Sequence, residues 1–228
     1  NKPVSLNERA RGYKLALEVM KWIFFKKGLL SYSPAHVGAF LKSSPAIDFP
    51  DLQFVFTPAS YTEGMIGKLQ NTPGITCGVW QSRPHSRGYV KAVSNDINVP
   101  PLIQPNYLKE KIDQDLMIEG VKRCRALLNT SNINKISIKE NLPGKDIKTD
   151  NEILDFIRNN GGTVYHAIGS CRMGMDKCAV VNSELKVNGI QNLRIADASI
   201  MPTMPSGNTN AATMMIAEKA SDLIKKDL

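Results

Sequence analysis

Hydrophobic and polar residues follow a helical period at the start of the chain. Ser5 and Glu8 have the spacing of a capping box, and apolar residues then recur every three to four positions from Tyr13 to Ile23. This pattern predicts one helix, which we expect to stop near Gly28 because glycine favours the end of a helix.

Two further helices are predicted in the middle of the chain. Residues 109–128 have an amphipathic pattern, with an inward face made of Leu116, Ile118, Val121, Cys124 and Leu127. Thr149 and Glu152 form a second capping box, which predicts a helix over residues 153–157. The polar stretch 129–148 between them is expected to be a loop with one short strand.

Alternating or continuous apolar residues predict strands over 49–56, 75–80 and 88–93. A short apolar stretch precedes them at 37–41, and a proline-rich extended segment follows at 99–107. Separated strands and helices of this kind favour an α+β fold over a regular alternation of strand and helix.

Composition and charge exclude several classes of protein. The chain has 228 residues, of which 42% are hydrophobic and 22% charged, so a largely disordered or fibrous chain is excluded. Its formal net charge is +8, but the basic residues are scattered, which argues against a nucleic-acid partner. No apolar run reaches the ~18 residues of a membrane span.

Cysteine and histidine residues give no metal site. The four cysteines form no C-x-x-C pair and the chain has 3 histidines, so we expect mostly reduced core thiols and no metal. His36 and His85 lie in turn-rich segments and receive no role. Localisation is left open by the sequence, with a cytoplasmic or membrane-associated setting favoured.

The last third of the chain holds the residues with chemical potential. A strand-like segment, 163–165, leads into His166, whose side chain suits a general base because histidine titrates near neutrality. A second apolar run, 193–195, ends near Asp197, which could accept hydrogen bonds from sugar or ribityl hydroxyls or simply cap a turn. Ser206 or Asn208 could cap a helix-forming run over 211–223, whose N-terminus could attract an anion or serve only as a helix start.

Three segments together resemble the C-terminal signature of the glucose-methanol-choline (GMC) family of FAD-dependent alcohol oxidoreductases. They read YHAIGSCRMG, VVNSELKVNGIQNLRIADASIMP and PSGNTNAATMMIAEKASDLI, in the family's order and spacing. Upstream segments such as SRPHSRGYVKAVSND resemble the family's substrate domain. The branch of choline and alcohol dehydrogenases is the most similar.

The resemblance implies a reaction in which hydride passes from an alcohol carbon to flavin N5 while a base takes the hydroxyl proton. It identifies His166 as the base and Asn208 as the second catalytic residue, which holds the substrate oxygen because an amide cannot be a base. It also implies that Asp197, the backbone of Ala198, Asn208 and the amides of Thr209 and Asn210 contact FAD. A small alcohol is the implied substrate, and the electron acceptor is not identified.

The chain departs from the family at one motif: it has no G-x-G-x-x-G for the ADP pyrophosphate. It also begins at Asn1 without an initiator Met. We therefore expect a fragment with an antiparallel substrate domain over 1–162. The C-terminal strand and helix of an FAD-binding domain would follow over 163–228, and the N-terminal FAD-binding portion would be a missing partner. The fragment alone is expected to be inactive. A non-catalytic binding protein that has lost its flavin domain is the alternative.

Overall fold

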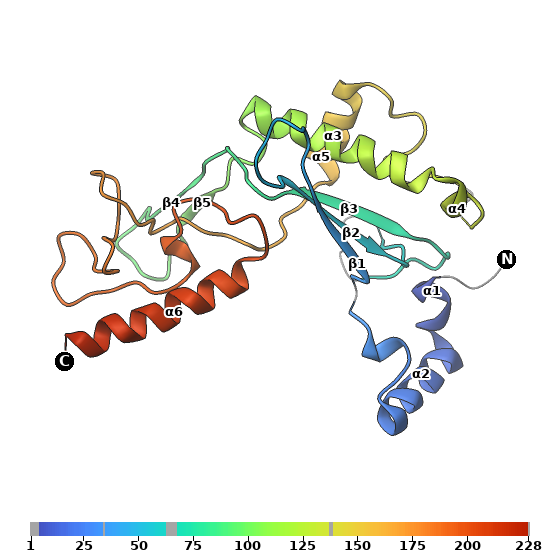
Figure 1. The fold of residues 1–228 in the computed structure, drawn as a ribbon, viewed down its shortest axis with the longest axis horizontal. Helices are drawn as coiled ribbons and strands as arrows, with labels where there is room; N and C mark the ends of the chain where they lie inside the picture. The colour runs from blue at the N-terminus through green and yellow to red at the C-terminus, as the bar shows by residue number, and fades with distance from the viewer. Residues whose placement is uncertain (1–4, 34, 63–67, 137–138, 228) are drawn as a thin grey trace. The chain divides into compact units, whose positions relative to one another are not determined.

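The computed structural model describes residues 5–33, 35–62, 68–136 and 139–227 (Figure 1). They group into two compact units, the first made of Asn1–Gln81 with Asp115–Gly161 and the second of Ser82–Gln114 with Gly162–Leu228. One boundary falls beside the expected division at residue 162. Residues 82–114 belong to the second compact unit, and the expected division into a substrate domain and an FAD-binding domain at residue 162 stays a prediction.

An antiparallel sheet forms the centre of the first unit. Its strands are β1 (Val37–Leu41), β2 (Leu52–Thr57) and β3 (Thr76–Gln81), with β2 in the middle. β2 and β3 confirm the predicted strands with shifted ends, and the apolar stretch at 37–41 is the third strand. Leu52 and Phe54, two residues apart on one face of β2, are buried as strand alternation requires.

Helix α3 (Lys111–Leu128) contacts this sheet closely. A Cβ on Gly120 would lie 2.9 Å from Cγ2 of Val79, so a glycine is needed where helix and strand approach. Of the predicted inward residues, Ile118 and Cys124 are buried, but Leu127 is exposed because it lies in the last turn of the helix. The mixture of antiparallel sheet and helices confirms the predicted α+β class.

The predicted N-terminal helix is wrong in one respect, because it is divided. The Ser5–Glu8 capping box opens α1 (Leu6–Arg9), and α2 (Gly12–Phe25) begins after a break, at a Gly12 with φ of +52°. The 3₁₀ helix η1 (Leu29–Ser31) follows.

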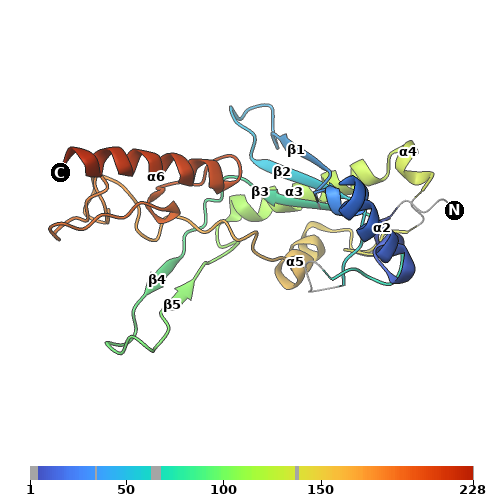
Figure 2. The ribbon, with the colours of Figure 1, turned by 90° about the horizontal axis from the view of Figure 1, so that it is seen from below.

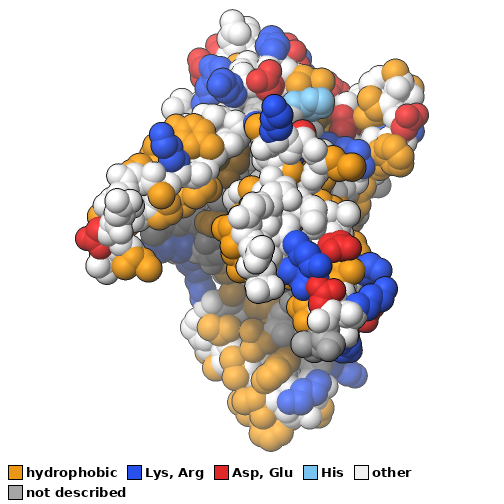
Figure 3. Space-filling view, turned by 90° about the vertical axis from the view of Figure 1, so that its left-hand side faces the viewer, with side chains coloured by type: hydrophobic (Ala, Val, Ile, Leu, Met, Phe, Trp, Pro, Cys, Tyr) orange, Lys and Arg blue, Asp and Glu red, His pale blue; other side chains and the backbone are white. Residues whose placement is uncertain are grey.

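The large apolar residues of α2 do not form a buried face of the helix. The large exposed side chains include Tyr13, Leu17, Met20, Phe24 and Phe25, while Glu18 is buried. Figure 3 shows hydrophobic side chains, in orange, uncovered on one face of the molecule. The helical period thus predicts the helix but not which residues the protein covers.

The predicted helix at 153–157 is confirmed as part of α5 (Asp150–Asn160). Both halves of its capping box are present: Glu152 accepts from the N–H of Thr149 at 2.8 Å, and Thr149 accepts from the N–H of Glu152 at 3.3 Å. The stretch 129–148, predicted as a loop with a short strand, contains helix α4 (Ser131–Asn134) and no strand among its described residues.

The second unit carries a two-stranded hairpin and a long helix. β4 (Tyr89–Lys91) pairs antiparallel with β5 (Leu102–Gln104), so the proline-rich extended segment supplies the partner of the predicted strand at 88–93 (Figure 2). The 3₁₀ helix η2 (Ala198–Ile200) precedes α6 (Thr209–Lys226). Their shared core consists of Val181, Leu185, Ile200, Met201, Ile216 and Ala220.

Two predicted strands are wrong, because 163–165 and 193–195 are not strands in the structure. Tyr165 has a φ of +60°, which no strand accommodates, and its side chain is exposed. Residues 193–195 make single contacts instead of a ladder: the N–H of Val187 bonds to the Leu193 carbonyl, and Arg194 forms an isolated bridge with Lys186.

The four cysteines are free, as expected. Cys124 is buried, Cys77 and Cys171 are half-buried, and Cys178 is exposed. Among the described residues, no helix is long and apolar enough to cross a membrane, and no group of three or more His, Cys, Asp or Glu residues could hold a metal ion.

Candidate active site

His166 lies in the second unit and bonds through both ring nitrogens to the start of α6. Its Nδ1 is 3.0 Å from Oγ1 of Thr209, and its Nε2 is 2.9 Å from Nδ2 of Asn208. The imidazole is half-buried, whereas Asn208 is exposed. More than forty residues separate these partners in sequence, so tertiary structure alone brings them together.

Asn208 is the N-cap residue of α6, yet its side chain makes no capping hydrogen bond. An N-cap asparagine usually accepts a bond from the N–H of the second or third helical residue. Here the amide contacts His166 instead. The first turn of α6 therefore offers N–H groups that Asn208 does not cap, with the partial positive charge of a helix N-terminus.

The imidazole of His166 and the amide of Asn208 are together suited to acid–base chemistry on a hydroxyl group. A neutral imidazole accepts a proton at the ring nitrogen that carries no hydrogen, and an amide donates a hydrogen bond without exchanging a proton. A hydroxyl group placed between Nε2 of His166 and Nδ2 of Asn208 would accept a hydrogen bond from the amide and lose its proton to the imidazole.

Asp197 and Ala198 lie at the beginning of η2. Oδ1 of Asp197 accepts from the N–H of Ser199 at 2.7 Å, so this carboxylate does cap the turn. The hydroxyl and the N–H of Ser199 hold the pKa of Asp197 below its usual range. The side chain is exposed and ionised, and can accept further hydrogen bonds.

Asn210, the last of the predicted site residues, points its amide along α6. Its Nδ2 lies 3.8 Å from the sulfur of Met214, one turn further on. The structure thus brings together His166, Asn208 and Thr209, and no hydrogen bond joins Asp197 or the Asn210 side chain to them among the described residues.

One contact near the site was not anticipated from the sequence. Nε of Arg83 bonds to Oγ of Ser206 at 2.6 Å, two residues before Asn208. Arg83 also lines an open, mostly apolar pocket of about 360 Å³, together with Met173, residues 200–205 and the α6 residues Ala212, Met215 and Ile216. No local pattern signals this contact, because 123 residues separate its partners.

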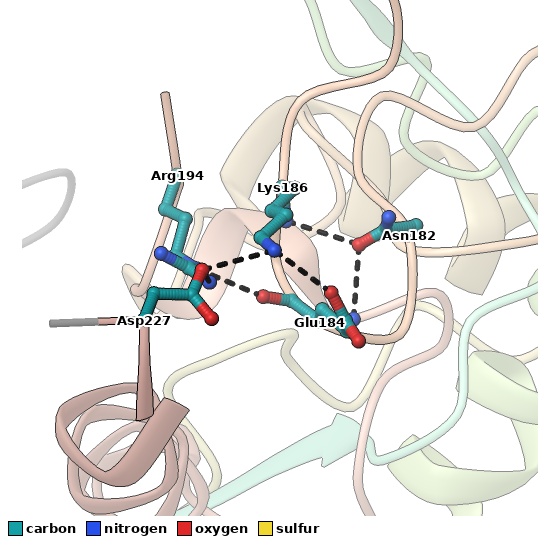
Figure 4. Close-up of polar contacts among 5 residues, drawn as sticks. All are labelled: Asn182, Glu184, Lys186, Arg194 and Asp227. Atoms are coloured by element: carbon teal, nitrogen blue, oxygen red, sulfur yellow. Dashed lines mark hydrogen bonds and ion pairs between the residues drawn. The ribbon is translucent and has the colours of Figure 1, made fainter. Parts of the chain in front are cut away.

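The far end of α6 is held by a charged network (Figure 4). Oδ2 of Asp227, just after the helix, is 2.6 Å from Nη2 of Arg194 and 3.0 Å from Nζ of Lys186. Arg194 and then Lys186 lower the pKa of Asp227. Lys186 also pairs with Glu184, and Asn182 accepts N–H bonds from both residues, so the loop 182–194 is fixed to α6.

The residues of this site lie within a segment that the chain shares with a known protein family. A family model described as GMC oxidoreductase matches residues 84–217, which is more than half of the chain. The chain therefore belongs to the GMC oxidoreductase family, whose members are FAD-binding enzymes.

Two curated relatives show the range of similar proteins. The chain is 41% identical over 206 residues to an alcohol dehydrogenase [acceptor] of Pseudomonas putida, covering 90% of this chain and 37% of the relative. It is 33% identical over 223 residues to an oxygen-dependent choline dehydrogenase of Cronobacter sakazakii, covering 98% and 40%. The chain thus spans about two fifths of the length of these relatives.

Solved structures agree on the fold. Pyridoxine 4-oxidase from Mesorbium loti is 26% identical, with a TM-score of 0.75, and the match covers 83% of this chain and 37% of that one. The formate oxidase of Aspergillus oryzae gives a TM-score of 0.85 over 98% of this chain and 44% of its own, at 21% identity, which is a likeness of fold only.

The second unit suits the cofactor of this family in two observable respects. A reduced flavin carries negative charge, and the start of α6 offers N–H groups and a positive dipole end that the Asn208 side chain leaves uncapped. The ionised, exposed Asp197 adds an acceptor for hydroxyl groups. These donors and this acceptor match the chemistry of a flavin with a polyhydroxyl chain.

Proposed function

We propose that this chain provides the catalytic pair of an FAD-dependent oxidoreductase that acts on the CH–OH group of a small alcohol. The observation that carries the proposal is the 2.9 Å contact between Nε2 of His166 and Nδ2 of Asn208 at the start of α6. Membership of the GMC family and relatives named for alcohol and choline support it.

In this proposal, His166 is the general base. Nε2 takes the proton of the substrate hydroxyl, while the amide of Asn208 donates a hydrogen bond to the same oxygen and holds it beside the imidazole. Because an amide does not accept a proton at neutral pH, proton abstraction rests on His166 alone. FAD, when bound, supplies the acceptor for the hydride at its N5.

The same proposal assigns the cofactor contacts. The N–H groups of Thr209 and Asn210 would face the flavin pyrimidine edge, together with Asn208, and Asp197 and the backbone of Ala198 would bind further along FAD. The sequence has no G-x-G-x-x-G, so we infer that an N-terminal FAD-binding portion with this motif is needed for turnover. The chain alone would then be inactive.

His166→Ala tests the catalytic role. We expect turnover of the FAD-loaded enzyme to fall by at least ~100-fold, since a general base contributes about that much, while flavin absorbance shows that FAD stays bound. His85→Ala is the matched control and should retain turnover. Near-normal turnover of His166→Ala would require a different base. An FAD-free protein without turnover that binds a small ligand would favour the non-catalytic alternative.

A further inference from the structure

The hydroxyl of Thr209, the first residue of α6, lies beside the imidazole of His166. Thr209 is buried, with 8% of its surface exposed, and its Oγ1 lies 3.0 Å from Nδ1 of His166. No part of the predicted reaction uses this hydroxyl, because the roles expected of Thr209 concern its backbone amide.

The two partners of the imidazole select one tautomer. Nδ2 of Asn208 is a donor, so Nε2 of His166 must present its lone pair to it. In a neutral imidazole the proton then sits on Nδ1, and the group facing Nδ1 must accept it. Oγ1 of Thr209 is the atom at that position, and a hydroxyl oxygen is an acceptor.

Threonine suits this position better than a flexible residue would. Its side chain is branched at Cβ, so few χ1 rotamers are available in a helix and the oxygen is held in a fixed direction. Burial of the side chain removes competing water, and an Nδ1–H left without an acceptor in such a place would be costly.

We propose that Thr209 is a positioning residue that fixes His166 in the Nδ1–H tautomer and aims Nε2 toward the substrate side. The tautomer is a property of the protein without substrate, and its assignment does not depend on the proposed function. Its consequence for catalysis rests on the proposed function of His166. Thr209 then acts through the imidazole and contacts no reacting atom.

The tautomer can be measured directly in the full chain. With ¹⁵N-labelled histidine at alkaline pH, two-bond ¹H–¹⁵N spectra distinguish a protonated from an unprotonated ring nitrogen, and His166→Gln assigns the signals. We expect Nδ1 of His166 to be protonated in the wild type and in Thr209→Ser. In Thr209→Val, which keeps the volume but removes the acceptor, we expect the Nε2–H tautomer to rise to at least about half of the population.

Thr213→Val is the matched control. It makes the same substitution one turn further along α6, where the hydroxyl bonds to the Thr209 carbonyl at 2.9 Å and not to the imidazole. The tautomer should not change in this variant. An Nε2–H tautomer in the wild type, or an unchanged tautomer in Thr209→Val, would overturn the proposal.

Kinetics test the consequence separately. In the FAD-loaded enzyme, Thr209→Val should lower kcat by about 10-fold or more with little change in KM or FAD content, and Thr209→Ser should restore most of kcat. A changed tautomer with unchanged kcat would overturn the positioning role. Full turnover in His166→Ala, with the wild-type tautomer as expected, would instead refute the proposed function and leave the tautomer assignment standing.

Discussion

Asp113 organises the loop that carries Arg83. This carboxylate is buried with 1% of its surface exposed, and it accepts three hydrogen bonds. The donors are the N–H of His85 at 2.8 Å, the N–H of Ser86 at 2.7 Å and the hydroxyl of Ser86 at 2.5 Å. A single side chain in the first turn of α3 thereby fixes residues 85–86, close in sequence to the arginine that contacts Ser206.

Asp113→Asn should therefore destabilise the second unit. The substitution turns an NH₂ group toward backbone N–H donors in a buried place, which we expect to cost about 2–3 kcal/mol of unfolding free energy. Chemical denaturation monitored by circular dichroism measures this. Asp155→Asn, at an exposed position on α5, should change stability by less than about 0.5 kcal/mol. Equal effects of the two substitutions would contradict the assigned role of Asp113.

At the scale of elements, Glu18 joins three helices of the first unit. Its Oε1 lies 2.6 Å from Nη2 of Arg9 in α1 and 3.0 Å from Nζ of Lys21 in α2, and its Oε2 accepts from the N–H of Leu29 in η1 at 2.8 Å. These contacts lower the pKa of Glu18 from 4.5 to about 2, and the hydrogen bond from Arg9 has the largest effect. The polar contacts of this carboxylate thus join α2 to its neighbours, where the sequence predicted apolar contacts.

This pKa predicts how stability depends on pH. Because the folded-state pKa is lowered, the contribution of Glu18 is complete above an unfolded-state pKa of 4.5 and is lost as pH falls toward about 2. Glu18→Gln should lower the melting temperature at pH 7, and the difference from the wild type should shrink between about pH 5 and pH 2. A difference that stays constant over this range would show that Glu18 acts by packing rather than by charge.

At the scale of the whole molecule, both units expose large apolar side chains. The first unit exposes Phe24 and Phe25 on α2, and the second exposes Met214 and Met215 on α6 and Ile103 on β5. The methionines lie on the same helix as Asn208 and Thr209. This exposed apolar surface is larger than the single scattered side chains that are normal on a protein surface. It is consistent with the proposed need for a further FAD-binding portion.

We expect flavin binding to depend on that portion. Co-expression of this chain with the N-terminal FAD-binding part of a GMC relative should yield a yellow complex with flavin absorbance, whereas the chain alone should be purified without colour. The control is the same N-terminal part expressed alone. Stoichiometric FAD in the isolated chain would contradict the inference that a further portion is required.

Much of this protein was already evident in local sequence. The capping boxes at Ser5 and Thr149 predicted two helix starts, and alternation predicted β2 and β3, because these signals depend on neighbours a few residues apart. The order of the C-terminal motifs indicated the GMC family and its cofactor, which the comparisons confirm. The same sequence motifs also indicated His166 and Asn208 as site residues, and the catalytic roles of these two residues stay predictions.

Tertiary structure decided what depends on distant partners. The break between α1 and α2, the burial of Glu18, the loss of two predicted strands and the contact of His166 with Thr209 have no local signature. Each is set by hydrogen bonds, positive φ angles or close packing with residues elsewhere in the fold. A sequence period records the geometry of one segment, whereas the direction of an imidazole depends on whichever atoms the folded chain places at its two nitrogens.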